Sequence, residues 1–375
     1  MPKALRVLHV IGDLQLGGAE TILYRLATTS LEGIEQEVIC LGERDWYSSR
    51  LEERGIPVHH LGMTSGASTI ARLGSLRALL RERRPDVIQS WMYLANVVSS
   101  LAATGLGVPV IWGIHASTFE HLGWPSRLCA YGGGLAARQL SSFVINCSEH
   151  SAKRHAGYGY AAVANAVIPN GYDSHAFYPD EERRARARTA LRLHLDEFVV
   201  GSVSRWHSEK DVPTLLAALA PLNVRCVLVG PDLEPSNTEL SQAIGSYGLG
   251  ERVLALGRRD DIGDLLRAMD LHILSSRSEA FPNVVAESML SGTPNIVTDV
   301  GDAGMMVGDS GWIVPAQDPG SLATALQEAI TEFSDEQTRW QARQVSARKR
   351  ITEHFSFDRM VSAYEEVWRQ LASKS

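Results

Sequence analysis

The sequence predicts an α/β protein with two Rossmann-like domains, each a doubly wound parallel sheet, that face each other across a cleft. Three observations support this fold class. Short apolar runs alternate with longer helical patterns along the chain, as in βαβ units. The alternation restarts at Phe198, after a polar stretch with turn residues that begins at Pro169. A length of 375 residues suits two domains better than one.

The first half of the chain is expected to form one of these domains. Its helical patterns include residues 19–29, 69–83 and 125–139. Its strand-like runs are residues 5–11, 36–41, 57–61, 86–91, 109–113, 142–146 and 164–168. We therefore expect an N-terminal domain over residues 1–171, followed by a linker over residues 172–192.

The second half repeats the pattern and is expected to form residues 193–355. Its strand-like runs are residues 198–204, 225–229, 252–256, 270–274, 294–297 and 311–314. The last segment, 356–375, is amphipathic, and we expect it to form a helix that packs back towards the N-terminal domain. Ligands of open parallel sheets bind beyond the carboxyl ends of the strands, so the loops that follow the strands should carry the chemistry.

Composition narrows the function classes. Residues 1–170 hold 15 Lys/Arg and 13 Asp/Glu, whereas residues 171–375 hold 21 and 30, which gives the net charge of −7. Nucleic-acid binding would require a strongly basic face, and this balance gives it no support. The four cysteines are far apart and form no C-x-x-C, which indicates buried reduced thiols in a cytosolic protein. We expect no secretory leader, because residues 6–12 have the pattern of a core strand, and no apolar run in the sequence reaches the ~20 residues that span a bilayer.

The most informative segment joins a predicted strand to a predicted helix that starts near Asn283. Pro282 suits a first helical turn, and the N–H groups that follow it, with the helix dipole, suit a phosphate or diphosphate. Glu287 lies one turn into the helix, within reach of a ribose beside that phosphate. Glu279 lies in the loop, where a sugar beyond the diphosphate would lie. The pattern therefore favours a nucleotide sugar.

Further polar and glycine residues follow other strands. Arg205 and Lys210 come after the first strand of the second domain, where two cations could stabilise the charge of a leaving diphosphate. Gly17 and Gly18 open the first helix, where the backbone can approach a ligand closely, although a tight turn alone would also explain them. His115 ends the fifth strand and could hydrogen-bond a transferred sugar, although a lone histidine is often structural.

The helix predicted over residues 69–83 carries several arginines. These are Arg72, Arg77, Arg81, Arg83 and, just beyond it, Arg84. A solvated helix face is the simpler explanation of these arginines, and contact with anionic lipid headgroups is the functional alternative. No H-E-x-x-H motif, P-loop, nucleophile elbow or Asp-x-Asp between strands occurs. The absence of Asp-x-Asp favours a design in which protein cations and helix ends, rather than a metal ion, hold the diphosphate.

Taken together, these motifs resemble the retaining glycosyltransferases of the GT-B fold, in particular glycosyltransferase family four. The resemblance covers nearly the whole chain. It rests on the Gly17–Glu20 loop, His115, the segment 167–171, Arg205 with Lys210, and the E-x7-E motif from Glu279 to Glu287.

The resemblance implies a role for each matched position. Glu287 would bind the ribose, Glu279 would contact the donor sugar, and backbone N–H groups after Glu279 would hold sugar and diphosphate. The catalytic residues implied are Glu279, His115, Arg205 and Lys210. The donor-binding residues implied are Gly17, Gly18, Arg205, Lys210, Glu279, Ala280, Phe281, Pro282, Asn283, Val284 and Glu287. No metal and no other cofactor is implied.

Two segments depart from the family pattern. Ala280 and Pro282 stand in Glu-Ala-Phe-Pro where the family often has Glu-Gly-Phe-Gly, and Asp211 stands where it often has Gly after Lys. The methyl group of Ala280 lies close to the expected sugar site, so the donor sugar is less well defined than the fold. The implied donor is a UDP- or GDP-sugar, and the implied acceptor is a glycan or lipid-linked glycan of cell-surface polysaccharide synthesis.

The family transfers sugars with retention of the anomeric configuration and acts without a dedicated protein base. We expect a cytoplasmic enzyme, with peripheral contact to an anionic membrane at the inner face as a further hypothesis. Two other functions stay open: a GT-B nucleotide-sugar epimerase, and a catalytically silent partner subunit of a transferase. An NAD-dependent dehydrogenase is a distant alternative, because the glycine fingerprint G-x-G-x-x-G is absent.

Overall fold

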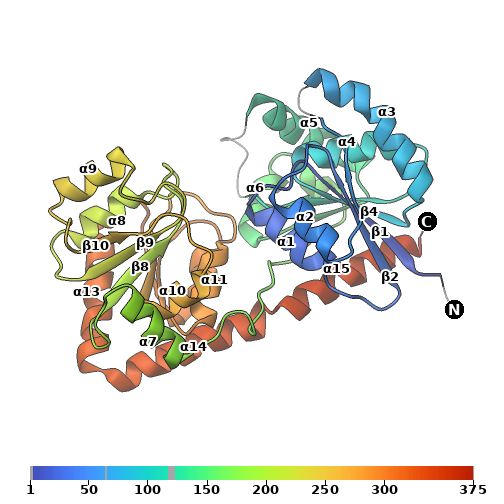
Figure 1. Cartoon of the computed structure of the whole chain (residues 1–375). Helices are drawn as coiled ribbons and strands as arrows, with labels where there is room; N and C mark the ends of the chain where they lie inside the picture. The colour runs from blue at the N-terminus through green and yellow to red at the C-terminus, as the bar shows by residue number, and fades with distance from the viewer. Residues whose placement is uncertain (1–2, 64–65, 117–122, 375) are drawn as a thin grey trace. The chain divides into compact units, whose positions relative to one another are not determined.

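The computed structural model describes residues 3–63, 66–116 and 123–374, which form two compact units (Figure 1). The first unit runs to Gly171 and takes up the chain again from Asp358, and the second unit covers Tyr172–Phe357. Each unit contains one parallel sheet with helices, so the predicted two-domain α/β fold is confirmed.

A seven-stranded sheet forms the centre of the first unit. Its strands are β1 (Leu5–Ile11), β2 (Ile34–Cys40), β3 (Val58–His60), β4 (Val87–Trp91), β5 (Val110–Ile114), β6 (Phe143–Asn146) and β7 (Asn165–Val167). All pairs are parallel, in the order β3-β2-β1-β4-β5-β6-β7. The strand order reverses between β1 and β4, and crevices at such switch points are where open α/β sheets bind ligands.

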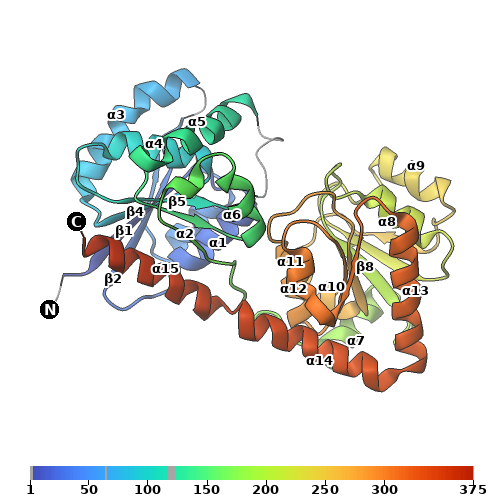
Figure 2. The same ribbon diagram turned by 180° about the vertical axis from the view of Figure 1, so that it is seen from behind.

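Helices cover both faces of this sheet. They are α1 (Gly18–Ala27), α2 (Trp46–Glu53), α3 (Gly66–Arg83), α4 (Tyr93–Ala103), α5 (Trp124–Leu140), α6 (Glu149–Ala156), the 3₁₀ turn η1 (Tyr160–Ala162) and α15 (Phe357–Ala372). In both views α3, α4 and α5 lie side by side over one face of the sheet, and α1, α2 and α15 lie on the other (Figures 1 and 2).

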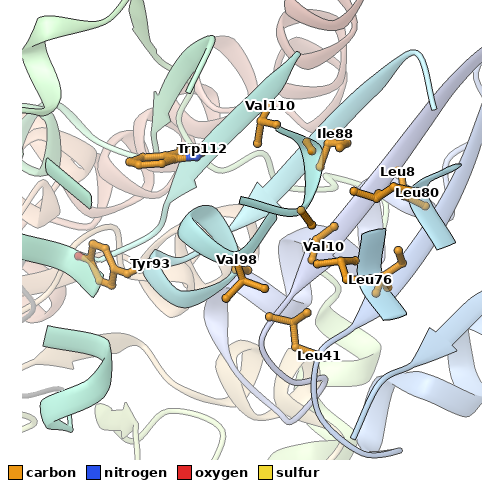
Figure 3. Packing of buried hydrophobic residues seen from close by; sticks show 14 of the residues in the cluster. Leu8, Val10, Leu41, Leu76, Leu80, Ile88, Tyr93, Val98, Val110 and Trp112 are labelled. Atoms are coloured by element: carbon orange, nitrogen blue, oxygen red, sulfur yellow. The ribbon is translucent and has the colours of Figure 1, made fainter. Parts of the chain in front are cut away.

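The core beneath α3, α4 and α5 is continuous. Leu76 and Leu80 of α3 and Val98 of α4 pack on Leu8, Val10 and other strand residues, all at most 4% exposed (Figure 3). Burial of such side chains is the main term that stabilises a unit of this kind.

The C-terminal helix α15 completes the other face of the first unit. Tyr364 and Trp368 are fully buried, and the Trp368 indole N–H donates to Gln89 Oε1 at 3.2 Å. The same rings lie against His9 and Trp91 of β1 and β4. Residues near the end of the chain therefore supply part of the core of the N-terminal unit.

A six-stranded parallel sheet forms the centre of the second unit. Its strands are β8 (Val199–Val203), β9 (Arg225–Val229), β10 (Val253–Ala255), β11 (Leu271–Leu274), β12 (Asn295–Thr298) and β13 (Trp312–Val314). Their order is β10-β9-β8-β11-β12-β13, so the switch point lies between β8 and β11. Every strand-like run predicted in the two halves of the sequence overlaps one of the observed strands.

The helices of the second unit follow its strands. They are α7 (Glu181–Ala190), α8 (Val212–Leu219), α9 (Thr238–Ser246), α10 (Ile262–Ala268), α11 (Asn283–Leu290), α12 (Ala303–Val307), the 3₁₀ turn η2 (Gly308–Ser310), α13 (Pro319–Asp335) and α14 (Gln337–His354). Among the described residues, no helix has the length and apolar character that crossing a membrane requires.

The predicted linker, residues 172–192, needs correction, because most of its second half is helix α7 of the second unit. The Asp180 side chain caps this helix by accepting the N–H of Arg183 at 2.9 Å. Arg184 and Arg188, one turn apart, each donate to the buried Asp270 at 2.6 Å. The polar composition that indicated a linker therefore belongs to a helix held by buried ion pairs.

Candidate active site

The loops after β8 and β11 meet at the switch point of the second sheet. Lys210, at the end of the β8 loop, donates from Nζ to Glu279 Oε1 in the β11 loop at 2.5 Å. Ser276 donates its hydroxyl to the same carboxylate oxygen at 2.6 Å. The Lys210 and Glu279 side chains are only 23% and 11% exposed, so this ion pair is partly withdrawn from water. The structure therefore brings together the predicted cation and the first carboxylate of the E-x7-E motif.

The backbones of the two loops are tied together below this pair. Ser275 donates its hydroxyl to the carbonyl of Lys210 at 2.9 Å, and the N–H of Arg277 donates to the carbonyl of Glu209 at 2.7 Å. Thr298, at the end of β12, donates its hydroxyl to the carbonyl of Ser276 at 2.7 Å. These bonds hold the Lys210 side chain in one place before a ligand arrives, which reduces the entropy that binding must overcome.

Asp211 explains how this chain departs from the Lys-Gly pattern. Its φ of 47° lies in the left-handed region that glycine adopts most easily, and its side chain is buried. The carboxylate accepts hydrogen bonds from Arg277 at 2.9 Å and from the Thr214 hydroxyl at 2.8 Å. The ion pair and the hydroxyl bond offset the strained backbone, so an aspartate can take the place of glycine here.

This arrangement gives a stability prediction. Arg277→Ala should lower the free energy of unfolding by about 1–3 kcal/mol, because it leaves a buried carboxylate with fewer partners. Asp211→Gly, added to that variant, should restore stability, since glycine takes positive φ without strain and removes the unpaired charge. Thermal melts of the two variants test this. A double variant no more stable than Arg277→Ala would contradict it.

The start of α11 faces the same end of the sheet. Pro282 is its N-cap residue, and no side chain caps the helix there. Phe281 is buried and stacks on Tyr172, with ring centroids 6.3 Å apart, and the Tyr172 hydroxyl lies 2.8 Å from Asn283 Oδ1. Tyr172, which the sequence did not single out, therefore fixes the first turn of α11. The arrangement suits an anion beyond the helix start.

The β12 loop closes on the Glu279–Ala280 backbone. Gly301 has a φ of +56°, and a Cβ atom there would lie 2.2 Å from the carbonyl oxygen of Glu279. The N–H of Asp302 donates to the carbonyl of Ala280 at 3.1 Å. Only glycine permits this approach at residue 301, so the close packing holds the segment that carries the predicted sugar contact.

The remaining predicted residues of the second unit lie around this centre. Arg205 follows β8 directly, and its side chain is exposed; within the described residues it makes no hydrogen bond or ion pair. Val284 and Glu287 are half-buried in the first and second turns of α11. The structure therefore pairs Lys210 with Glu279 but leaves Arg205 pointing into solvent in this state.

Gly17 and Gly18 lie at the start of α1, after β1 at the switch point of the first sheet. Gly17 is the N-cap of α1, and a Cβ atom there would lie 2.2 Å from Glu20 Oε2. Burial raises the pKa of Glu20 to about 7, with a further increase from the charge of Asp13. The Glu20 carboxyl group lies over Gly17, and the spacing of the two residues in the sequence does not show this.

His115 follows β5 in the first unit and is held by two side chains. Its ring stacks on Trp91 at 4.9 Å, and its Nε2 lies 3.4 Å from the hydroxyl of Tyr364. Burial lowers the pKa of His115 to about 4, and the polar side chain of Asn170 only partly offsets this. The imidazole is therefore neutral at pH 7. It can donate or accept a hydrogen bond, but it supplies no positive charge.

A cavity of about 750 Å³ lies elsewhere in the second unit, between α7, α14 and the amino-terminal ends of β11 and β12. The switch-point rule places ligands at the opposite, carboxyl ends of the strands. Two arginines that line the cavity are engaged with backbone: Arg184 donates to the carbonyls of Arg267 and Met269, and Arg348 to those of Phe177 and Leu290. We therefore assign the site to the Lys210–Glu279 end of the sheet.

No group of three or more His, Cys, Asp or Glu side chains arranged to hold a metal ion occurs in residues 3–63, 66–116 and 123–374. The charged groups gathered at the second switch point are those of Lys210 and Glu279, with the Arg277–Asp211 pair behind them. A dianionic ligand bound at Lys210 would compete with the Glu279 carboxylate for the ammonium group.

Two family models match the chain, one in each unit. "Glycosyl transferase 4-like domain" matches residues 17–171, and "Glycosyl transferases group 1" matches residues 197–332. The second match contains Arg205, Lys210 and the whole E-x7-E motif.

Curated relatives and solved structures give the same result. The lipopolysaccharide core biosynthesis mannosyltransferase LpsB of Rhizobium meliloti (strain 1021) is 27% identical over 269 residues, which are 68% of this chain and 71% of LpsB. The putative glycosyltransferase EpsF of Bacillus subtilis (strain 168) is 27% identical over 320 residues, 78% of this chain and 79% of EpsF. The structure of Anabaena Alr3699/HepE with UDP-glucose superposes with a TM-score of 0.84 at 25% identity, covering 98% of this chain and all (100%) of that one.

Proposed function

We propose, because this chain belongs to the family-four glycosyltransferases with a GT-B fold, that it transfers a sugar from a UDP- or GDP-sugar to a hydroxyl group of a glycan or lipid-linked acceptor. The observation that supports this most is the Lys210–Glu279 pair at the switch point of the second sheet, beside the start of α11. In the HepE structures, UDP, glucose and UDP-glucose are bound. LpsB, named for lipopolysaccharide core biosynthesis, supports a role in cell-surface polysaccharide synthesis.

The proposed roles follow from charge and position. Lys210 and Arg205 would stabilise the diphosphate as it leaves, with the N–H groups at the start of α11. Glu279 would accept hydrogen bonds from the sugar hydroxyls, and Glu287 from the ribose. Gly17 and Gly18 would approach the diphosphate, and the neutral His115 would hydrogen-bond the transferred sugar.

The reaction we propose is a front-face substitution. The bond between the anomeric carbon and the diphosphate oxygen breaks, and the acceptor oxygen forms a bond to the same face of that carbon. The departing phosphate oxygen takes the proton of the acceptor hydroxyl, so the configuration is retained without a protein base or a metal ion.

The first experiment identifies the donor and the stereochemistry. A thermal-shift screen with UDP, GDP, ADP, TDP and CDP should reveal one preferred nucleotide, since a ligand at a hundred times its Kd stabilises by ~2.7 kcal/mol. The matching nucleotide sugar should then give a product whose anomeric configuration, read by NMR, equals that of the donor. An inverted product would overturn the mechanism, and donor turnover without any acceptor would favour an epimerase.

Metal removal tests the other part of the proposal. Turnover should be unchanged by EDTA, because Lys210 and the helix start neutralise the diphosphate without a divalent cation. Loss of activity with EDTA and its return with manganese would refute this.

Glu20 gives a pH prediction for the same reaction. With a pKa of about 7, its carboxyl group is mostly neutral at pH 6 and charged at pH 8, where it repels an anionic donor at the Gly17 loop. The KM for the donor should therefore rise by about tenfold from pH 6 to pH 8. Glu20→Gln should remove most of this rise. An equal rise in both proteins would exclude Glu20 as its cause.

A further inference from the structure

Helix α5 of the first unit presents an apolar ridge to solvent, formed by Trp124, Leu128, Tyr131 and Leu135. These side chains are 77%, 65%, 40% and 83% exposed. Their spacing of four, three and four residues places them on one face of the helix. The opposite face, with Ala130 and Ala137, is fully buried in the core shared with α4. The α5 ridge is thus an outward apolar face on a helix whose inner face is already packed.

This concentration of apolar side chains is unusual within the described residues. Their other exposed large apolar side chains are scattered over different elements: Leu16, Leu101, Leu195, Tyr247, Met305, Ile313 and Val345. Single exposed apolar residues need no explanation, but a contiguous row of four large ones indicates a surface that is covered in use.

The surroundings of the ridge are basic although the chain is acidic. Helices α3, α4 and α5 lie together on one face of the sheet (Figures 1 and 2) and hold six arginines and one glutamate, in a chain of net charge −7. Arg127 and Arg138 are exposed and lie within one turn of ridge residues, and Arg81 of α3 is exposed as well. Arg77 is engaged, because it donates to the carbonyls of Ala102 and Thr104 at the end of α4.

The charge decides between two occupants of the ridge. A second copy placed symmetrically on this helix layer would set one basic face against another, which opposes association. An anionic lipid bilayer offers opposite charge and an apolar interior. Trp and Tyr prefer the bilayer interface, and arginine side chains reach from an apolar face to headgroups. A helix with an apolar stripe flanked by arginines is the form that lies in this interface.

We propose that the α5 ridge, with Arg127, Arg138 and Arg81 of α3, docks the first unit on an anionic lipid surface. The proposal rests on the proposed function for one point, that the acceptor is lipid-linked. It adds the surface that would bring the enzyme to such an acceptor. The apolar ridge enters the headgroup region and the arginines pair with lipid phosphates. The ridge, rather than the arginines of α3 alone, is the part of the surface that the sequence pattern did not reveal.

Vesicle binding by the full chain tests the proposal without donor or acceptor. Co-sedimentation uses phosphatidylcholine vesicles with and without phosphatidylglycerol. The wild type should bind the anionic vesicles, and the partition coefficient should fall by about tenfold or more in Trp124→Ser/Leu128→Ser/Leu135→Ser and in Arg127→Glu/Arg138→Glu. The control Leu195→Ser/Val345→Ser, which removes exposed apolar groups of the second unit, should bind like the wild type.

Separate readouts keep the outcomes distinct. All variants should keep the thermal stability and the nucleotide-induced thermal shift of the wild type, because the altered side chains are exposed and lie outside the active site. Equal vesicle binding by wild type and ridge variants overturns the proposal while the transferase assignment stands. So does a wild-type dimer in light scattering that the ridge substitutions convert to a monomer, since the ridge would then join two copies.

Discussion

Lys210→Ala should lower kcat for sugar transfer by about 10²–10³-fold, the effect of removing one preorganised group that stabilises developing charge. The Lys210 carbonyl accepts a hydrogen bond from Ser275, and its ammonium group donates to Glu279. Because both ends of the residue are held, solvent or a neighbouring cation cannot readily substitute for it. Arg205 is exposed and makes no hydrogen bond in the described residues, so it has less preorganisation to contribute. Steady-state kinetics with a saturating nucleotide sugar measure the loss.

A matched lysine provides the control. Lys349 of α14 is 67% exposed and forms a surface ion pair with Glu353, so Lys349→Ala should keep wild-type turnover. Because Lys210→Ala leaves Glu279 with fewer partners, Lys210→Arg serves as a second variant that keeps the charge and should retain more activity. Turnover of Lys210→Ala within threefold of wild type (about 0.7 kcal/mol) would remove Lys210 from the mechanism.

Trp368→Ala should destabilise the first unit by about 3–5 kcal/mol, the usual cost of emptying a buried aromatic site. Trp368 is fully buried, donates to Gln89, and lies 5.6 Å from the ring of His9 and 5.8 Å from that of Tyr364. Loss of the indole would leave a cavity, and it would remove the hydrogen bond that Gln89 Oε1 accepts. Hydrogen exchange of the β1 and β4 amides measures the effect on this unit alone.

The exposed Trp124 is the matched control for this measurement. Trp124→Ala removes the same side chain from a site that is 77% exposed, so exchange in β1 and β4 should be unchanged. Similar exchange in Trp368→Ala and the wild type would show that α15 does not stabilise the N-terminal sheet.

The sequence predicted the strands of both sheets because buried parallel strands are short apolar runs bounded by turn residues, as at 198–204 and 225–229. It also placed Lys210 and Glu279 in loops that follow strands of one sheet, but it paired Lys210 with Arg205 and did not foresee the Lys210–Glu279 contact. The linker over 172–192 was not predicted correctly. A helix rich in arginine and glutamate has the composition of a solvated segment. Its arginines Arg184 and Arg188 instead donate to the buried Asp270, about 80 residues further on. Composition within a window carries no information about such a partner.

Other parts of the site depended on contacts that no local pattern encodes. The sequence identified His115 but not Tyr364, which lies about 250 residues away and reaches the imidazole only through α15. The raised pKa of Glu20 depends on burial and on Asp13, not on its motif. The α5 ridge was also missed, because an amphipathic pattern shows which residues share a face but not which face is packed.

The position of α15 has a consequence for biosynthesis. On the ribosome, residues 1–171 emerge long before Trp368 and Tyr364 are made, so the early polypeptide carries an uncovered apolar face throughout synthesis of the second unit. The N-terminal sheet can therefore reach its final packing only after residues 358–372 have been synthesised. A nascent chain stalled before residue 358 should remain protease-sensitive in its first half, however complete the rest of it is.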